Sequence, residues 1–359
     1  MKILKDTIHF FRREPRWAFL LAAVLVLLGL VQLRPHKSEE NERPHAALHK
    51  FEQAENKLKD EIKSTGGIEK YLEKRPGLQW IFGILILAVV TAFLAGLAID
   101  FLWFSRPQFR KRILSSAGPP EARNWGFSTI LKTILLFIVG SIGLSLILAV
   151  TKSFILKELN SNLLILIHTT ISDIFCIGLA VYFIRRLGGS WRDLGFRHVR
   201  FWKDVGMGVA GYLAILPLFV LALVILLIVI QLFSVEPPPH PLVEVFLEEE
   251  KSPGVTAYSI FLACVAGPIF EEIFFRGFCY PAMKKRWGVR WALVLSSAFF
   301  SAIHQNLFAF VPVFILGLCL GYLYEKRGTL VPSMTLHILH NSVFILYFFL
   351  AKDILTRGS

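Results

Sequence analysis

Long apolar runs separated by short polar segments make up most of the chain. Most of these runs are long enough to cross the roughly 30 Å hydrocarbon core of a bilayer as a helix. The pattern therefore predicts an all-α polytopic membrane bundle with about nine transmembrane helices. The runs cover residues 17–33, 79–104, 128–151, 162–184, 206–233, 257–283, 289–304, 307–324 and 330–350.

The charges between the runs predict how the bundle is oriented. Segments 105–127 and 185–204 are rich in arginine, and the basic clusters 284–286 and 326–327 close two later runs. Because basic residues in short loops mark the cytoplasmic side, we expect the N-terminus inside and the C-terminus outside. The charged segment 34–77 would then lie outside, although it also contains many lysines.

The first apolar run, 17–33, has two interpretations. It resembles the apolar part of a signal peptide, but no small-residue cleavage site follows it. We therefore expect an uncleaved anchor.

Composition supports the membrane interpretation and excludes others. The chain is 55% apolar, and its net charge of +13 would suggest a nucleic-acid partner in a soluble protein. Here the basic residues fall in short loops between apolar runs, so we expect no nucleic acid. The four cysteines lie in or beside apolar runs without a metal-binding or disulfide spacing, so we expect no disulfide framework.

Clusters of polar residues interrupt four of the apolar runs. Charges inside a membrane span are costly, at about 2.5–3.5 kcal/mol for a residue at the helix centre, and usually mark a functional site. The clusters comprise His168 and Asp173; Glu271, Glu272 and Arg276; His304, with Phe300 one turn before it; and His337, His340 and Asn341.

These clusters lie at similar depths. At about 1.5 Å per residue, Glu271 is roughly 20 Å from Lys284, and His304 is roughly 21 Å from Arg290. The same count places Asp173, His337 and Asn341 roughly 15–21 Å from their own basic anchors. A shared, water-holding cavity requires such a match in depth.

Helical periodicity assigns the residues to faces. His337 and Asn341 are four residues apart and share one helix face, as do Phe300 and His304. Glu272 and Arg276 have the same spacing and can form an ion pair. Glu271 points about 100° away from Glu272, which leaves it freer to act.

These residue types suit the hydrolysis of a peptide bond. A glutamate in an apolar cavity beside a histidine can deprotonate a water molecule, so we assign this role to Glu271 with His304. Donors at the developing oxyanion are also needed, and His337 with Asn341 can supply them. Phe300 is expected to pack beneath His304.

Structural and non-enzymatic interpretations remain open. The charged residues can form a structural ion network, and each histidine taken alone is more often a packing residue. His340 is expected to be a packing residue, and Asp173 and His168 are either structural or partners of the site. Rival functions are a non-catalytic immunity or scaffold protein that retains the cavity, and a transporter, although no inverted repeat is evident.

Three motifs resemble those of a known family. Glu271-Glu-Ile-Phe-Phe-Arg276, Phe300-Ser-Ala-Ile-His304 and His337-Ile-Leu-His-Asn341 resemble the EExxxR, FxxxH and HxxxN motifs of the CPBP family. That family includes the type II CAAX prenyl endopeptidases and bacterial proteins named for bacteriocin processing and abortive infection. The three motifs are complete and in family order, and they cover roughly residues 257–350.

The resemblance implies an intramembrane endopeptidase without a covalent intermediate. It implies that Glu271 is the catalytic glutamate, assisted by His304, and that His337 and Asn341 stabilise the oxyanion. The other motif residues, Glu272, Arg276 and Phe300, are implied to support the site.

The family has been described both as metalloproteases and as glutamate proteases. The chain has no HExxH motif, so the usual zincin geometry is absent. We expect no cofactor. If the enzyme is metal-dependent, Glu271, His304 and His337 are the expected zinc ligands.

The organisation that follows has two parts. Residues 1–127 are expected to form an N-terminal transmembrane hairpin with a charged extracytoplasmic segment, and residues 128–352 a CAAX-protease-like transmembrane catalytic core. The expected partners are the lipid bilayer and a membrane-embedded or lipid-anchored peptide substrate, with prenylated and CAAX-like substrates included. The expected location is a bacterial inner (plasma) membrane, with the N-terminus cytoplasmic.

Overall fold

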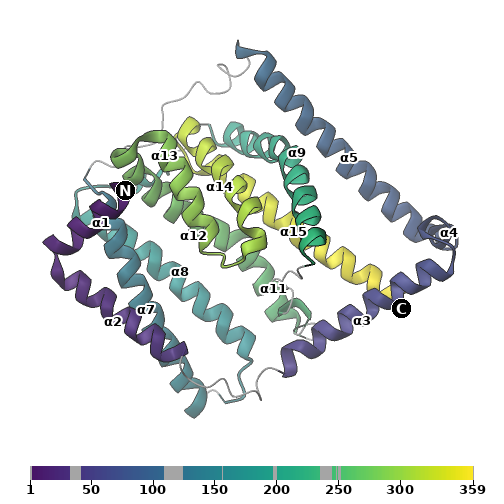
Figure 1. Cartoon of the computed structure of the whole chain (residues 1–359), viewed down its shortest axis with the longest axis horizontal. Coiled ribbons are helices and arrows are strands. Elements are labelled where there is room, and N and C mark those ends of the chain that lie inside the picture. Colours follow the sequence, from purple (N-terminus) through teal and green to yellow (C-terminus); the bar gives the residue numbers. More distant parts are fainter. Residues whose placement is uncertain are drawn as a thin grey trace.

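The computed structural model is helical throughout the part of the chain that it describes (Figure 1). It describes residues 2–32, 42–108, 124–155, 157–196, 200–234, 245–247, 249 and 252–358, and these residues contain no strand. The predicted all-α fold is confirmed. Residues 33–41 of the expected outer segment and 109–123 of the expected basic loop lie outside the described residues.

The described residues form a series of helices. Their bounds are α1 (Lys2–Arg13), α2 (Pro15–Gln32), α3 (Glu42–Ser64), α4 (Ile68–Glu73), α5 (Pro76–Ser105), α7 (Phe127–Phe154), α8 (Ser161–Arg186), η1 (Trp191–Leu194), α9 (Phe201–Phe233), α11 (Pro253–Phe261), η2 (Leu262–Ala266), α12 (Gly267–Glu272), η3 (Ile273–Cys279), α13 (Tyr280–Ala302), α14 (Leu307–Arg327) and α15 (Val331–Gly358).

Seven helices in the described residues are long and apolar enough to cross a membrane, so the chain is a multi-pass membrane protein. The expected number of nine is not confirmed. Two expected spans, 257–283 and 289–304, fall in one helical run, Pro253–Ala302, whose backbone turns at Gly288 with a φ of 76°. The expected first span, 17–33, forms α2, whose described apolar part, Pro15–Val26, is shorter than the seven spans.

We call the end of the bundle that carries Arg185, Lys284 and Arg327 the basic end, and the opposite end the far end. At the basic end, a buried ion pair joins Arg327 of α14 to Asp204 of α9, with Nε 2.7 Å from Oδ1. Lys284 donates to both carboxylate oxygens of Glu325 at 2.8 and 2.9 Å. These contacts connect the helices where they leave the membrane.

The N-terminal helices lie against the outside of the bundle (Figure 1). The α1–α2 corner is tied to α7 by Lys132, whose Nζ donates to Glu14 at 2.6 Å. α5 crosses α9 where Gly96 meets Leu213, so closely that a Cβ at Gly96 would lie 2.3 Å from the Leu213 carbonyl oxygen. α3 contacts the far half of α15 through stacked rings of Phe51 and Phe348, 6.4 Å apart.

The elements α11, η2, α12 and η3 form one continuous helix, Pro253–Cys279, which we call the central helix, and its irregular backbone determines where its polar residues point. Two π-helical segments, η2 and η3, flank the short α12, and such segments are frequent at functional sites. Pro268 follows η2 and has no N–H to donate. In a π-turn, the N–H of a residue bonds to the carbonyl oxygen five residues earlier. Pro268 therefore leaves the carbonyl of Ala263 without a backbone donor. That carbonyl is available to a side chain from another helix.

Candidate active site

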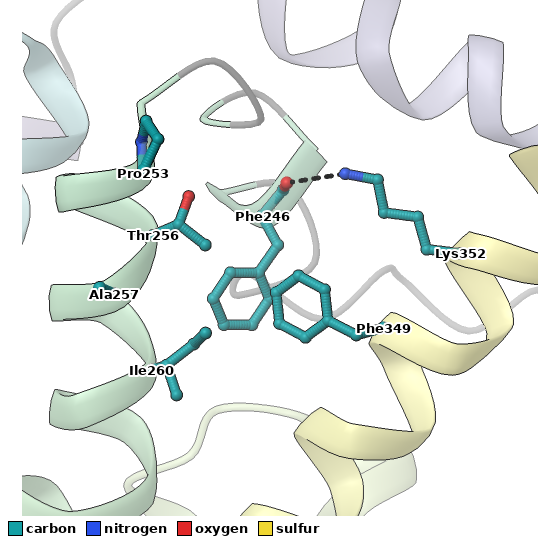
Figure 2. A pocket seen from close by; sticks show the side chains of 7 residues that line it. All are labelled: Phe246, Pro253, Thr256, Ala257, Ile260, Phe349 and Lys352. Carbon is teal, nitrogen blue, oxygen red and sulfur yellow. Dashed lines mark hydrogen bonds between the residues drawn. The ribbon is translucent and has the colours of Figure 1, made fainter.

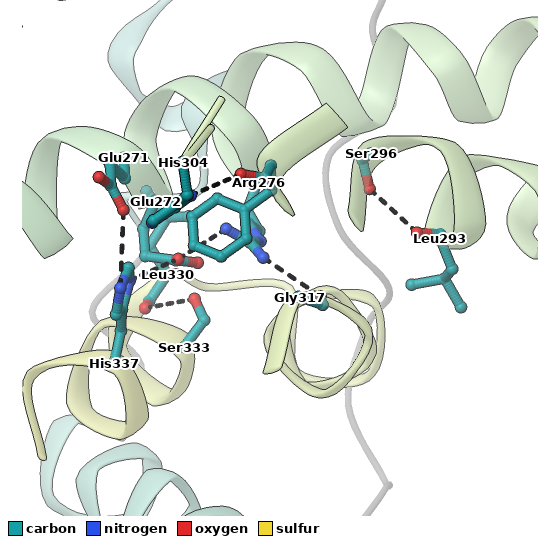
Figure 3. Close-up of polar contacts among 11 residues, drawn as sticks. Glu271, Glu272, Arg276, Leu293, Ser296, His304, Gly317, Leu330, Ser333 and His337 are labelled. Carbon is teal, nitrogen blue, oxygen red and sulfur yellow. Dashed lines mark hydrogen bonds and ion pairs between the residues drawn. The ribbon is translucent and has the colours of Figure 1, made fainter. Parts of the chain in front are cut away.

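The candidate site begins with a buried ion pair on the central helix (Figure 3). Arg276 Nη1 donates to Glu272 Oε1 at 2.8 Å, and the side chains are 1% and 0% exposed. Arg276 Nη2 also donates to the carbonyl oxygen of Gly317 on α14, at 3.2 Å. The pairing expected from the four-residue spacing is therefore present. A buried charge needs such partners because desolvation otherwise makes it costly.

His337 connects this ion pair to the second glutamate. Its Nδ1 lies 3.1 Å from Glu272 Oε1, and its Nε2 lies 3.6 Å from Glu271 Oε2. The Nδ1 proton is assigned from its carboxylate partner, since Glu272 is an acceptor when ionised. Figure 3 shows the His337 ring reaching between the two glutamates from α15. The distance to Glu271 is slightly too long for a direct hydrogen bond, although the two groups are close enough to attract each other electrostatically.

The two adjacent glutamates have different environments. The Glu271 side chain is 32% exposed, whereas Glu272 is fully buried. Because a carboxylate facing hydrocarbon is costly, the exposed part of Glu271 must meet water or substrate. The divergence of the two side chains expected from helical periodicity is what the structure shows.

Phe300 forms the apolar floor of the site. Its ring lies 4.5 Å from the Arg276 guanidinium, in a cation–π contact. Its centroid is 4.9 Å from the ring of His304 and 5.6 Å from that of His337, and both rings meet it edge-on. Phe300 thus packs against both imidazoles and restricts how their rings can turn.

We expected His304 to pair with Glu271, but in the structure its imidazole contacts a different group. Its Nδ1 lies 2.8 Å from the carbonyl oxygen of Phe300, one turn earlier in the chain. The ring is exposed and stands in the turn between α13 and α14. Among the described residues, the imidazole that approaches Glu271 is that of His337. Counting depth along each helix could not distinguish the two, because it gives the level of a residue and not its direction.

Asn341 lies one turn from His337 and contacts the central helix. Its Nδ2 donates to the Ala263 carbonyl oxygen at 2.8 Å. This is the carbonyl that Pro268 leaves without a backbone donor. The amide nitrogen of Asn341 has a second proton, which this bond does not use. Pro268 is the sequence signal from which this contact could have been inferred; the Gly317 carbonyl had no such signal.

The remaining polar candidates divide into one near the site and two away from it. Asp173 of α8 is within electrostatic reach of Glu271. His168 instead contacts Ser145 of α7, with Nε2 2.9 Å from Oγ. His340 packs between the rings of Phe219 and Tyr212, at 5.1 and 6.2 Å, which agrees with the packing role expected for it.

The alternative zinc set does not assemble. Among the described residues, no group of three His, Cys, Asp or Glu side chains lies close enough to hold a metal ion. Within the set Glu271, His304 and His337, the structure brings His337 to Glu271 at 3.6 Å, whereas the Nδ1 atom of His304 lies against the Phe300 carbonyl. These residues therefore do not fit a three-ligand metal centre in this conformation.

Comparison with known proteins identifies the segment that holds the site. Residues 253–343 match the family model described as type II CAAX prenyl endopeptidase Rce1-like. The match covers about a quarter of the chain and includes all three motifs. It confirms the resemblance to the CPBP family and is, at family level, a match to CAAX-type intramembrane proteases. No curated protein and no solved structure matches the chain.

Proposed function

We propose that this chain, whose segment 253–343 matches a CAAX-type intramembrane protease family, is an endopeptidase that hydrolyses a peptide bond of a membrane-associated protein. The observation that carries the proposal is the position of Glu271. Its partly open carboxylate lies 3.6 Å from an imidazole whose other nitrogen is held by a buried ion pair. This places an acid–base pair at a carboxylate that is 32% exposed and so can be reached from outside the protein.

In the proposed reaction, Glu271 accepts a proton from water as the water oxygen attacks the scissile carbonyl carbon. The carbonyl oxygen becomes an oxyanion, and the C–N bond breaks when the same proton is transferred from Glu271 to the leaving nitrogen. Both the proton and the water oxygen end in the products, and no covalent enzyme intermediate forms.

Donors for the oxyanion come from α15. To serve as an oxyanion donor, His337 must carry a proton on Nε2 as well as on Nδ1. The Nδ1–H group of His337 donates to Glu272, and its Nε2–H group is directed toward the reacting oxygen. The second amide proton of Asn341 is the other proposed donor. Together they would oppose negative charge where it develops.

The supporting residues maintain this geometry. Glu272 and Arg276 hold His337 in place, and Phe300 restricts how both imidazole rings can turn. His304, on the other side of Phe300, has its Nε2 free of the Phe300 carbonyl contact and is proposed to assist Glu271 once substrate is bound. Glu271, His304, His337 and Asn341 are thus the proposed catalytic residues.

The proposed setting follows from the charges. The basic loops support a cytoplasmic N-terminus, and we propose a bacterial inner membrane and a membrane-embedded or lipid-anchored substrate. We further propose that residues 128–352 form the catalytic core and residues 1–127 an accessory hairpin. The family match lies wholly within the proposed core.

The deciding experiment compares Glu271→Gln with wild type in proteoliposomes that contain membrane-tethered peptides. We expect kcat to fall at least about 100-fold, the loss typical of removing a general base. Glu158→Gln, which neutralises an exposed carboxylate at the far end, is the matched control and should retain full turnover. Unchanged turnover in a correctly folded Glu271→Gln protein would contradict the proposal and favour a scaffold role.

A further inference from the structure

A pocket lies at the far end of the bundle, between α11 and α15 (Figure 2). Its volume is about 420 Å³, and a single one of its lining residues, Lys352, carries a charge. The pocket therefore combines a mainly apolar wall with one cation. The lining residues are Phe246, Pro253, Thr256, Ala257, Ile260, Phe349 and Lys352.

The segment that precedes α11 supplies part of the pocket wall and is fixed in place. Phe246 is 2% exposed, and its ring centroid lies 5.1 Å from that of Phe349 on α15. Three residues later, the Glu249 carboxylate accepts hydrogen bonds from Asn160 at 2.7 Å and Asn162 at 2.8 Å, at the start of α8. The wall is therefore anchored to two helices, and no carboxylate is among the seven lining residues.

The polar groups of the pocket offer a ligand few directional hydrogen bonds. The Thr256 hydroxyl donates to the Glu249 carbonyl oxygen at 2.9 Å, and Pro253 has no N–H. Lys352 Nζ lies 3.5 Å from the Phe246 carbonyl oxygen, which is a long hydrogen bond. Peptides are usually held by backbone hydrogen bonds or by several precisely placed polar groups. This pocket instead suits a ligand that needs apolar contact and one positive charge.

The position of the pocket along α15 places it at the far edge of the hydrocarbon core. α15 begins at Val331, at the basic end. From there Phe349 is roughly 27 Å along the helix and Lys352 roughly 32 Å, at about 1.5 Å per residue. Because the hydrocarbon core is about 30 Å thick, Phe349 lies just inside its far boundary and the Lys352 ammonium at the level of the lipid headgroups.

The order of apolar and charged groups in the pocket matches that of a phospholipid. Figure 2 shows the Lys352 ammonium and Pro253 toward one end of the pocket and Ile260 toward the other. On the central helix, Ile260 is about two turns deeper in the membrane than Pro253. The charge therefore lies on the headgroup side of the apolar wall, as the phosphate of a lipid lies above its acyl chains.

We propose that the α11–α15 pocket binds one anionic phospholipid of the far leaflet, with the upper part of an acyl chain against Phe349 and Ile260 and the phosphate beside Lys352. An anionic lipid fits better than a zwitterionic one, because the latter carries a cation that opposes Lys352. This inference goes beyond the proposed peptidase activity and does not depend on it, since lipid binding requires no turnover.

The charge is tested by photolabelling the purified protein in detergent micelles. The probe is phosphatidylglycerol with a photoreactive diazirine on one acyl chain, and phosphatidylcholine with the same chain is the comparison. Labelled residues of α11 and α15 are located by mass spectrometry. In Lys352→Gln we expect the phosphatidylglycerol concentration for half-labelling to rise about fivefold, the contribution of one lysine beside anionic lipid, and that for phosphatidylcholine to stay unchanged.

Lys157→Gln is the matched control for the charge. Lys157 is an exposed lysine at the far end, in the connection between α7 and α8, and it does not line the pocket. This variant should label as wild type does. Equal half-labelling concentrations for phosphatidylglycerol in wild type and Lys352→Gln overturn the proposal, as does wild-type labelling by phosphatidylcholine as strong as that by phosphatidylglycerol.

The apolar part is tested by filling the pocket. Ala257→Trp should reduce labelling of α11 and α15 by both lipids, because the indole occupies the space of the acyl chain. Phe261→Trp, at an exposed neighbour outside the pocket, is the matched control and should label as wild type does. Ile260→Trp replaces Ala257→Trp if that variant does not fold. Equal labelling of the filled variant and its control overturns the proposal.

Two further measurements separate this proposal from the peptidase proposal. Glu271→Gln should bind phosphatidylglycerol as wild type does, so its loss of turnover and the occupancy of the pocket are read independently. If Ala257→Trp raises KM for a membrane-tethered peptide while lipid labelling stays at the wild-type level, the pocket belongs to the peptide substrate and the lipid assignment is overturned.

Discussion

His337 donates through Nδ1 to Oε1 of Glu272, at 3.1 Å, and this bond joins α15 to the buried ion pair of the central helix. The bond makes Glu272 a structural carboxylate: Arg276 and His337 both depend on it, and neither is solvated. Glu271, the adjacent residue, has one polar contact at 3.6 Å and is partly exposed. Two neighbouring glutamates should therefore respond differently to the same substitution.

We expect Glu272→Gln to lower the free energy of unfolding by about 3–5 kcal/mol, because it leaves Arg276 buried without its counter-charge. Glu271→Gln should change it by less than about 0.5 kcal/mol, as is usual for a partly exposed position. Thermal unfolding in detergent measures both. Equal stability of the two variants would show that the buried pair does not hold the site together.

The bond between Asn341 and Ala263 gives a second prediction, in the form of a double-mutant cycle. Asn341→Ala should cost about 1–3 kcal/mol, because the partly buried carbonyl of Ala263 loses its donor. Pro268→Ala restores a backbone N–H that can reach this carbonyl. In that background we expect Asn341→Ala to cost less than half as much. Additive costs, measured by denaturant unfolding, would mean that Pro268 does not create the unpaired carbonyl.

These two contacts show what the sequence could and could not predict. Apolar runs located the spans, and the four-residue spacing predicted the pairing of Glu272 with Arg276, because both depend only on local periodicity. The approach of His337 rather than His304 to Glu271 depends on how separate helices are rotated about their axes, which depth counting does not contain. The π-helical segments add a further rotation, since each shifts the phase of the residues after it.

Metal dependence gives a third prediction. The alternative ligands do not assemble into a group of three in the part of the chain that the structure describes. We therefore expect prolonged treatment with a strong chelator to leave turnover of a membrane-tethered peptide within about twofold of the untreated enzyme, since catalysis would rest on acid–base groups alone. If the chelator abolishes turnover and added zinc restores it, this expectation is wrong. The metal ligands would then come together only when substrate or solvent is bound.

The N-terminal corner gives a prediction of pH dependence. The hydrogen bond from Lys132 lowers the pKa of the Glu14 carboxyl from its ordinary value of 4.5. Because the folded pKa lies below the unfolded one, this contact stabilises the docked corner above about pH 4.5, and the stabilisation is lost as pH falls through the lowered pKa. The protection of the α1 amides, corrected for the intrinsic pH dependence of hydrogen exchange, should therefore fall below that pH.

Glu14→Gln is the comparison that isolates this group. The variant should exchange faster than wild type at neutral pH, and the difference between the two should vanish in acid. The pair between Asp6 and Arg286, which also holds α1, is present in both proteins and cancels. A difference that persists at low pH would mean that the carboxylate charge does not hold the corner.

The crossing of α5 and α9 tests how firmly α5 is attached to the rest of the bundle. Gly96 lies against the Leu213 carbonyl, whereas a Cβ at Gly83, in the same helix, would meet nothing within 4 Å. We expect Gly96→Ala to destabilise the crossing by about 1–3 kcal/mol, the usual cost of overpacking, because backbone on α9 cannot move aside as a side chain can. Gly83→Ala should be neutral or slightly stabilising, since alanine favours the helix.

A cysteine pair replacing Trp103 and Tyr322, whose rings lie 6.2 Å apart, reports the contact of α5 with α14 by cross-linking. If α5 is held chiefly at Gly96, cross-linking should fall in Gly96→Ala and not in Gly83→Ala, and an equal yield in both would place its main attachment elsewhere.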